Sequence, residues 1–444
     1  MKRKFITLII AIIILSSINF SYASEQIQQS TNDKLNINAE SAILIDEQSG
    51  NVLYEKNSSQ RMYPASTTKL LTAILIAEKY QDLSQKANVS YYAVHKVPYS
   101  YSIASLIPGE QISLKDLLDS LMVASANDSA FVLAEYMAND GNNYPINSSA
   151  DAETKFKNSI ESFSNMMNQK AKDLGCKNSN FVNPNGIHNE NHYSTAYDLA
   201  LIGKYAYNNS TIMSFAQKLS ATLSNSNLYT GNQRTFTTTN LLLHKEKSGY
   251  YAYANGLKTG YTDAAKYCII ASAKKDDRNL IVVILHSDNC TNPETSRESD
   301  CKKLFEYGFN NYINTTLINS GDIVRTLYVL NSTSQTKSLN IYAESNLKVL
   351  MKKGAPLDIT PQINLTKLFA PISKGEIVGT ITYTINNVNY TSNLIADHDV
   401  YSLNYAFIII ILASIFIILI FTLSLIIRSK NRKNNWIKYI KITF

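Results

Sequence analysis

PASTTKLLTAILIA, the sequence of residues 64–77, contains the start of a long helix. Pro64 suits a first helical turn, because the N–H that proline lacks would have no helical partner there. The apolar residues that follow recur at spacings of three and four, as in a helix that packs against a core; they are Leu70, Leu71, Ile74, Leu75 and Ala77. Ser66 is therefore expected at or near the beginning of this helix.

The same stretch contains the sequence Ser-x-x-Lys at residues 66–69. A separation of three residues places the Ser66 hydroxyl and the Lys69 amine on one face of the helix, within reach of each other. Serine becomes a nucleophile when a base removes its proton, and a desolvated lysine beside another cation can serve as that base. The structural alternative is a helix-capping serine followed by a surface lysine.

Short strands are predicted before this helix, and further helices after it. Residues 42–45 and 52–54 flank a turn that contains Gly50, which indicates two paired strands. Apolar residues at helical spacing predict three more helices, at about residues 113–123, 127–138 and 153–174.

After Ser248 the pattern changes to strands. Residues 267–273 and 280–286 are β-rich and flank a charged turn, which predicts a hairpin. A helix from about residue 297 to 311 closes the segment. Strands first, helices in the middle and a hairpin at the end predict an α/β (α+β) domain over residues 39–312.

The C-terminal third has a different character. Residues 317–399 consist of short strand-like runs without helical periodicity and predict a small all-β domain. Residues 406–427 carry no charge over 22 positions, enough for a transmembrane helix. The basic tail, residues 428–444, is then expected on the cytoplasmic side and the body outside the cell. A buried core helix, the alternative, would not explain the flanking cations.

The N-terminus predicts a secretory signal over residues 1–23. Its cationic start is followed by an apolar run and by small residues before Ser24. An uncleaved anchor helix is the alternative. Residues 24–38 are polar and are expected to form a flexible lead-in.

The net charge of +7 reflects the two ends of the chain. Residues 1–23 and 428–444 hold nine of the 42 basic residues and no acid, which leaves 33 basic against 35 acidic residues in the body. This distribution predicts membrane topology and excludes a nucleic-acid-binding surface. Of the four cysteines, Cys290 and Cys301 could pair in an oxidising compartment, although the sequence alone does not establish a disulfide.

Two further motifs carry candidate chemistry. Ser125–Ala126–Asn127 lies between two predicted helices, where the serine can relay a proton and the asparagine can hold a peptide; an ordinary helix N-cap is the alternative. A Lys-Ser-Gly sequence at residues 247–249 lies in a polar, loop-like run. Lys258–Thr259–Gly260 instead leads into the hairpin, so an edge strand there would present a cation and a hydroxyl to a carboxylate, with glycine allowing close approach.

Ser-x-x-Lys, Ser-x-Asn and Lys-Thr-Gly occur in the order shared by penicillin-binding proteins and β-lactamases. Over residues 39–312 the chain resembles the low-molecular-mass D-alanyl-D-alanine carboxypeptidases, serine peptidase family S11, and more weakly over the β-domain that follows. The motifs that carry the resemblance are Pro64–Lys69, Ser125–Asp128, Phe181–Gly186, Tyr193–Leu199 and Asn255–Thr262.

The resemblance implies a DD-peptidase/β-lactamase-like catalytic domain and a role for each matching residue. Ser66 would be the nucleophile and Lys69 its base, and the backbone N–H groups of Ser66 and Tyr261 would form the oxyanion hole. The remaining residues would transfer protons or bind the substrate and its terminal carboxylate; they are Ser125, Asn127, Lys258, Thr259 and Gly260.

The chain departs from this family in two places. Lys266 stands where the family usually has glycine, which bears on the local strand geometry. The charge-free C-terminal run predicts a membrane-spanning helix, whereas family members often end in an amphipathic surface helix.

Two other constellations are interpreted as structural. Glu161 and Asn165 resemble the deacylating motif of class A β-lactamases, but their surroundings predict a solvated helix face. His188 and His192 bracket Glu190 without a known third ligand, so no metal site is expected.

The predicted function is D-alanyl-D-alanine carboxypeptidase activity on peptidoglycan stem peptides, without a cofactor and with β-lactam antibiotics as inhibitors. The alternatives are a β-lactamase, which needs a deacylating base, and a catalytically silent penicillin-binding sensor or wall-binding module. The expected location is the cell membrane, with a single C-terminal anchor and an extracytoplasmic catalytic domain.

Overall fold

The computed structural model describes residues 35–141, 145–231, 233–288, 296–356, 359–385 and 388–442, with side chains of the last helix described as far as Arg432. The predicted signal segment and Cys290 lie outside the described residues. The chain divides into two compact units between Asn314 and Thr315, and Leu350–Ala355 pack with the first unit.

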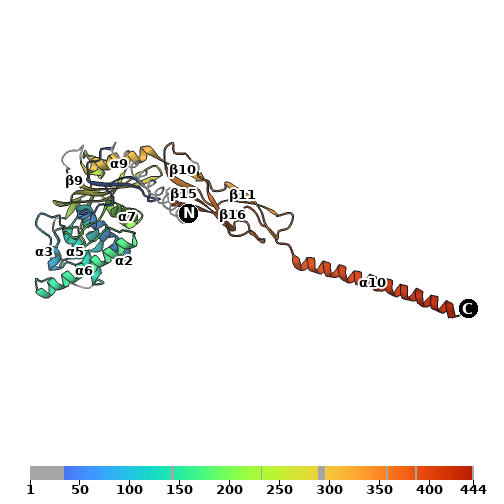
Figure 1. Cartoon of the computed structure of the whole chain (residues 1–444). Coiled ribbons are helices and arrows are strands. Elements are labelled where there is room, and N and C mark those ends of the chain that lie inside the picture. The colour runs from blue at the N-terminus through green and yellow to red at the C-terminus, as the bar shows by residue number, and fades with distance from the viewer. Residues whose placement is uncertain are drawn as a thin grey trace, which may run out of the picture. The chain divides into compact units, whose positions relative to one another are not determined.

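A five-stranded antiparallel sheet forms the centre of the first unit (Figure 1). Its strand order is β2-β1-β9-β8-β7. The strands are β1 Ser41–Asp46, β2 Val52–Lys56, β7 Ala254–Thr262, β8 Lys266–Lys275 and β9 Arg278–Ser287. The predicted N-terminal strand pair and C-terminal hairpin are thus both present, and β1 joins them by pairing with β9 along its whole length.

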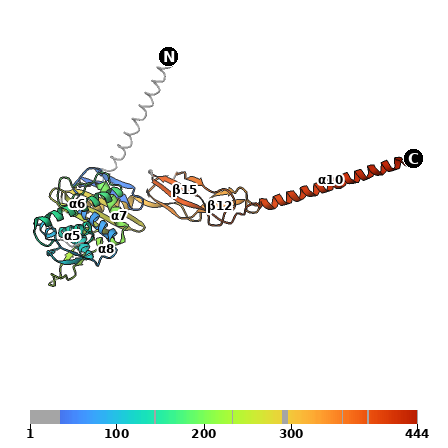
Figure 2. The same cartoon turned by 90° about the horizontal axis from the view of Figure 1, so that it is seen from below.

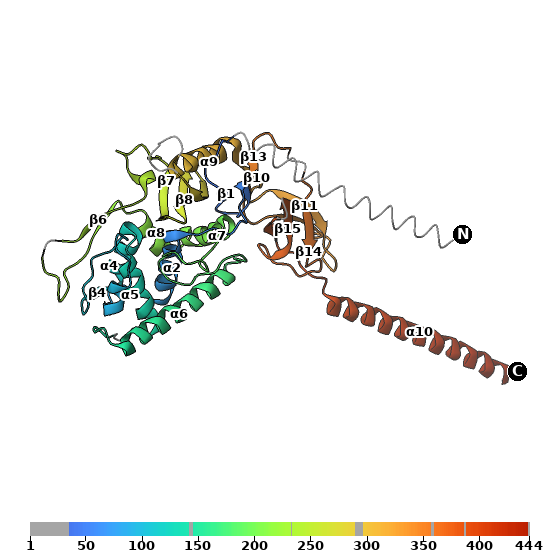
Figure 3. The ribbon, with the colours of Figure 1, turned by 60° about the vertical axis from the view of Figure 1, so that its left-hand side comes forward.

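The sheet is buried on both faces. Along β9, Ile281 and Val283 belong to one core cluster, whereas Val282 and Ile284 belong to the other. Side chains alternate between the faces of a strand, so one apolar run supplies both cores. The helix α7 covers one face, with α2 beside it and α5 and α6 farther from the sheet, and α9 covers the other face (Figure 3).

The predicted helices are present, with bounds that differ by a few residues: α2 Lys69–Lys79, α4 Leu114–Asp119, α5 Asn127–Ala138, α6 Ala150–Asp173 and α9 Arg297–Asn311. The helix α7 Ala196–Tyr207 was not predicted. Short helices are η2 Ala65–Thr68, α3 Tyr91–His95, the π-helix η3 Ser120–Ala124, α8 Ser210–Ala216 and η4 Leu241–Leu243. Two small hairpins pair β3 Lys86–Asn88 with β4 Gln111–Ser113 and β5 Ser220–Thr222 with β6 Thr235–Thr237.

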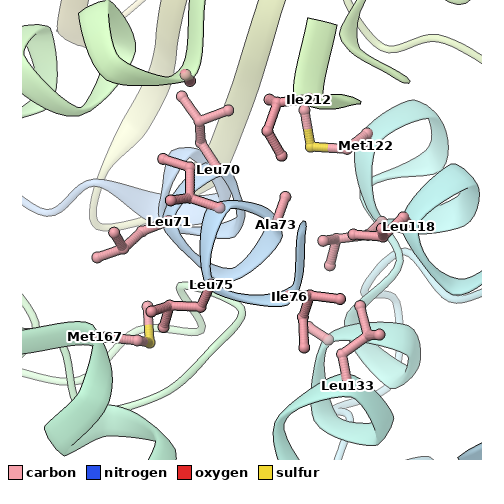
Figure 4. Packing of buried hydrophobic residues seen from close by; sticks show 14 of the residues in the cluster. Leu70, Leu71, Ala73, Leu75, Ile76, Leu118, Met122, Leu133, Met167 and Ile212 are labelled. Carbon is pink, nitrogen blue, oxygen red and sulfur yellow. The ribbon is translucent and has the colours of Figure 1, made fainter. Parts of the chain in front are cut away.

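The helix that begins at Lys69 lies in the middle of the larger core cluster. Every residue of α2 from Lys69 to Ala77 is buried. Figure 4 shows Leu71, Ala73 and Leu75 of α2 among side chains from the surrounding helices, including Leu118 and Met167. A helix that is enclosed on all sides holds its first turn, and therefore Ser66, in a fixed position.

The part of the lead-in that the structure describes is attached to the first unit. Ile37 is buried, and the backbone N–H groups of Asn38 and Ala39 donate to the Asp300 carboxylate at 3.0 and 2.9 Å. The chain is therefore held in place from about Ile37 onward.

The second unit is a β-structure followed by one helix (Figure 2). Its five-stranded sheet has the order β11-β12-β16-β15-β14, and β10 and β13 form a separate pair. Their bounds are β10 Tyr312–Ile318, β11 Ile323–Tyr328, β12 Ser338–Ala343, β13 Leu347–Lys352, β14 Gln362–Leu365, β15 Ile377–Ile385 and β16 Val388–Ala396. The final helix, α10 Tyr405–Ile442, contains a segment, Tyr405–Arg432, that is long and apolar enough to cross a membrane.

Candidate active site

Ser66 lies in the turn η2 that leads into α2. The Pro64 carbonyl accepts hydrogen bonds from the Thr67 N–H at 3.3 Å and the Thr67 hydroxyl at 2.7 Å. Ala65, just before the serine, has a φ of +48°, a conformation that alanine rarely adopts. Such strain is common at functional sites, where the surrounding structure enforces it.

Lys69 is completely buried, and its Nζ has three hydrogen-bond partners. They are the Ser66 Oγ at 2.8 Å, the Asn127 Oδ1 at 2.9 Å and the Asn185 carbonyl at 2.7 Å. An amide oxygen can only accept, so the last two contacts use two N–H bonds of the amine. In the neutral amine the remaining lone pair then faces the Ser66 hydroxyl. This is the geometry of a general base.

The surroundings of Lys69 favour its neutral form. Burial is the main cause that lowers its pKa well below the ordinary value, and the charge of Lys258 acts in the same direction. Asp128 opposes the shift. The Asp128 carboxylate is itself buried and accepts from the backbone N–H groups of Ala104 and Leu106. The amine is therefore neutral well below the pH at which an exposed lysine would lose its proton.

A loop from another part of the chain supports the nucleophile. Gly186 has a φ of +77°, and a Cβ added there would lie 1.8 Å from the Ala65 carbonyl oxygen. The neighbouring carbonyls of Pro184 and Asn185 accept from the Thr72 hydroxyl and from Lys69. The loop therefore sets the position of both the serine and the lysine.

Ser125 and Asn127 lie where the π-helix η3 meets α5. Ser125 ends η3 with a φ of +61°, a second strained non-glycine residue at the site. Asn127 accepts from Lys69 through its Oδ1 and donates through its side-chain nitrogen to the Ser102 carbonyl at 2.9 Å. These bonds fix the orientation of the amide.

The edge strand β7 passes directly beside Ser66. A Cβ added at Gly260 would lie 2.8 Å from the Ser66 backbone nitrogen, so only glycine allows this approach. Thr259 shares a hydrogen bond of 2.5 Å with Thr239. Lys258 is buried and donates to the Thr259 carbonyl at 3.0 Å. Burial, with a smaller contribution from Arg297, lowers the Lys258 pKa to about 7.

These elements enclose a cleft of about 290 Å³. Six of the predicted residues line this cleft: Ser66, Ser125, Asn127, Thr259, Gly260 and Tyr261. Lys69 and Lys258 lie behind this surface, each bonded to a residue that lines it. The structure therefore brings together all eight residues that the sequence singled out.

Several residues of the site were not predicted. Arg297, at the start of α9, lines the cleft and donates to the Gly260 and Cys268 carbonyls at 3.2 and 3.3 Å. Asn185 contributes its backbone carbonyl. Every residue has this group, so the residue type does not reveal the contact. Thr239, in the segment that connects β6 to η4, also lines the cleft. Arg297 was visible as a basic residue at a helix start, but nothing local placed it near Ser66.

None of the residues that the sequence analysis interpreted as structural lines the cleft. Glu161 is exposed on α6, and residues 247–249 lie in turns outside the sheet. His192 is buried and bonded to the Thr68 hydroxyl at 2.8 Å, whereas His188 is exposed. Among the described residues, no group of acidic residues, cysteines and histidines could hold a metal ion.

Lys266 occupies a backbone position that suits glycine, the residue expected there from the resemblance. It opens β8 with a φ of +54°, the left-handed conformation that glycine adopts without steric cost. Lys266 still pairs with Thr262 across the hairpin. A lysine here therefore strains the turn but leaves the edge strand intact.

A serine at a helix start, bonded to a buried lysine in a cleft beside an edge strand, is the arrangement of a serine peptidase. The sequence model of the peptidase S11 family, D-alanyl-D-alanine carboxypeptidase, matches residues 27–147 and 147–289. The family model of the C-terminal domain of penicillin-binding protein 5 matches residues 312–402. The chain belongs to this family of D-alanyl-D-alanine carboxypeptidases, the penicillin-binding serine peptidases.

Individual relatives agree with this assignment. D-alanyl-D-alanine carboxypeptidase DacF of Bacillus subtilis is 31% identical over 387 residues, which cover 86% of this chain and 90% of the relative. The D-alanyl-D-alanine carboxypeptidase of Streptomyces sp. strain K15 is 34% identical over 265 residues, 59% of this chain and 83% of its own. The structure of penicillin-binding protein 5 from Haemophilus influenzae matches with a TM-score of 0.62 at 25% identity, covering 83% of this chain and 98% of that one.

Proposed function

We propose that this enzyme removes the terminal D-alanine from peptidoglycan stem pentapeptides through an acyl-enzyme on Ser66. The contacts of Lys69 carry the proposal, because two obligate acceptors leave its lone pair facing the serine hydroxyl. Lys69 takes the hydroxyl proton as Ser66 Oγ attacks the penultimate D-alanine carbonyl. The N–H groups of Ser66 and Tyr261 stabilise the resulting oxyanion.

The leaving group needs a proton, and Ser125 is the residue proposed to relay it from the Lys69 amine. The C–N bond then breaks, D-alanine departs, and the shortened peptide remains as an ester on Ser66. Water hydrolyses this ester and restores the serine. Lys258 and Thr259 would hold the terminal carboxylate; Arg297 lines the same cleft and is itself paired with the buried Glu298 at 2.8 Å.

A direct assay tests this function. The purified enzyme should release D-alanine from a diacylated Lys-D-Ala-D-Ala peptide, and Ser66→Ala should abolish the release while binding of the peptide persists. A folded wild-type protein that binds penicillin without releasing D-alanine would instead be the silent sensor. Rapid turnover of penicillin would indicate a β-lactamase, which the exposed position of Glu161 disfavours.

The pH profile should report on Lys258. With a pKa of about 7, this lysine loses its charge as the pH rises above neutrality, so attraction for the substrate carboxylate falls. We expect kcat/KM to decrease above about pH 7, approaching tenfold per pH unit. Lys258→Arg, which stays charged, is the control: its activity is lower, but this decrease should disappear. A wild-type profile that stays flat from neutral to alkaline pH would contradict the carboxylate-binding role.

We also propose that α10 is the single membrane anchor of the mature enzyme and that its catalytic unit is extracytoplasmic. The cations after Ile427 support this orientation. The Leu403 N–H donates to the Asn331 carbonyl at 2.9 Å, so the β-structure extends almost to the helix.

A chain that ends at Asn404 tests the anchor, because it lacks α10 alone. It should be recovered in the soluble fraction and cleave small peptides as fast as the full chain. The matched control ends at Arg432, which retains the span and should stay with the membrane. Loss of peptide cleavage by the shorter chain, while it remains folded, would show that α10 does more than anchor the protein.

A further inference from the structure

Exposed apolar side chains gather at the end of the second unit from which α10 departs. We call this end the apex and define it as residues 328–338, 366–370 and 400–405. The exposed fractions of its large side chains are high: Tyr328 73%, Leu330 56%, Phe369 62%, Tyr401 61% and Tyr405 54%. Leu368 and Leu403 are each 37% exposed. Apolar residues gathered in this way on a surface indicate a binding site.

Hydrogen bonds hold the three segments of the apex together. The Leu330 N–H donates to the Leu368 carbonyl at 2.9 Å, and the Leu330 carbonyl accepts from Ala370 at 2.9 Å. The Thr333 N–H donates to the Tyr401 carbonyl at 3.0 Å. The apex is therefore an ordered part of the β-structure, and its three segments lie next to one another.

The charged residues within the apex are lysines, and the acids Glu376 and Asp399 lie outside it, Asp399 next to Val400. The apex residues include Lys337 and Lys367 and no aspartate or glutamate. The Lys337 ammonium lies 5.7 Å from the centre of the Tyr328 ring, while Lys367 pairs with Glu376 outside the apex. Aromatic and aliphatic side chains combined with lysine are typical of surfaces that rest in the headgroup region of an anionic membrane.

The connection to α10 places the apex next to any membrane that this helix spans. Leu403 is still bonded to Asn331, and Asn404 alone separates it from Tyr405, where α10 begins. Two residues reach at most about 7 Å. The contact of Leu403 with Asn331 therefore lies within the thickness of a headgroup layer from the start of the span, whatever direction the helix takes.

We propose that the apex binds the anionic phospholipid headgroups of the leaflet that α10 enters. The inference rests on the proposed membrane span of α10. The apex then acts as a second, weaker membrane contact that restricts how the β-structure tilts on the bilayer. A few partly exposed apolar side chains bind lipid reversibly and do not replace the anchor.

Tryptophan reporters in the full chain test this proposal. The chain has one tryptophan, Trp436, which is first replaced by phenylalanine. Phe369→Trp then reports on the apex. Ile323→Trp is the matched control, because Ile323 is 65% exposed but lies on β11 at the end that pairs with Tyr342, away from the apex. Ile418→Trp reports on the span itself. Each variant is reconstituted into phosphatidylglycerol-containing vesicles with and without brominated lipid.

Brominated lipid should reduce the fluorescence of Phe369→Trp about twofold and leave Ile323→Trp almost unchanged. Replacing phosphatidylglycerol by phosphatidylcholine should weaken the effect; equal quenching in both lipids would overturn the anionic preference. If Ile418→Trp is quenched and Phe369→Trp is not, the apex does not touch lipid. A blue shift of Phe369→Trp without quenching would place the apex against another copy of the chain and overturn the lipid contact. An unquenched Ile418→Trp would overturn the membrane span, and the inference with it.

Discussion

Replacing Lys69 by alanine is expected to slow the acylation of Ser66 by about 10²-fold or more. The hydroxyl then loses the amine that lies 2.8 Å from it, and the buried carbonyl of Asn185 loses its donor. The measurement is the rate of covalent labelling by a fluorescent penicillin under single-turnover conditions. Thermal unfolding of the same samples separates a chemical defect from a folding defect.

Glu161→Ala is the control for this experiment. Glu161 is exposed on α6 and should leave both acylation and deacylation unchanged. Retention by the Lys69 variant of more than about a tenth of the wild-type acylation rate would contradict the role of Lys69 as the base. A large effect of Glu161→Ala would revive the β-lactamase hypothesis.

Gly186→Ala is expected to lower activity by about 10²-fold, although residue 186 contributes no catalytic group. A Cβ there would lie 1.8 Å from the Ala65 carbonyl oxygen, so either the loop or the serine must move. Movement of the loop also displaces the Asn185 carbonyl from Lys69. The fold should lose about 1–2 kcal/mol from the positive φ and about 1–3 kcal/mol more from the steric clash.

Gly175→Ala is the matched control for Gly186→Ala. Gly175 has a φ of +89°, but a Cβ there would meet only a leucine methyl group at 3.7 Å. Its alanine variant should unfold at a lower temperature because of the unfavourable φ, but its acylation rate should be almost normal. Equal acylation rates for the two variants would show that the loop does not position Ser66.

Local signals predicted the positions of the main site residues well. The spacing of Ser66 and Lys69 and the start of α2 are both local, so the sequence placed the pair correctly. Lys258 was distinguished from Lys247 by the strand that follows it, and the structure places Lys258 on the edge strand and Lys247 in a turn outside the sheet. The pattern of apolar residues predicted the strands of the sheet. Consecutive residues in these strands are apolar, as expected for strands that are buried on both faces.

Long-range features were not predictable in the same way. The pairing of β1 with β9 joins segments more than two hundred residues apart, and an apolar strand does not specify its partner. The Asn185 carbonyl is a backbone group, so no residue type announces it. The π-helix η3 and the positive φ of Ser125 result from tertiary packing that overrides local preference. The approach of Arg297 to the cleft depends on how α9 packs against the sheet.

The central claim, an acyl-enzyme on Ser66, is tested most directly by mass spectrometry of the intact and proteolysed protein after reaction with a labelled penicillin. The account predicts one adduct per chain, located on the peptide that contains Ser66, absent from Ser66→Ala and stable for minutes or longer. An adduct on any other residue, or release of the penicillin product many times per second, would contradict it.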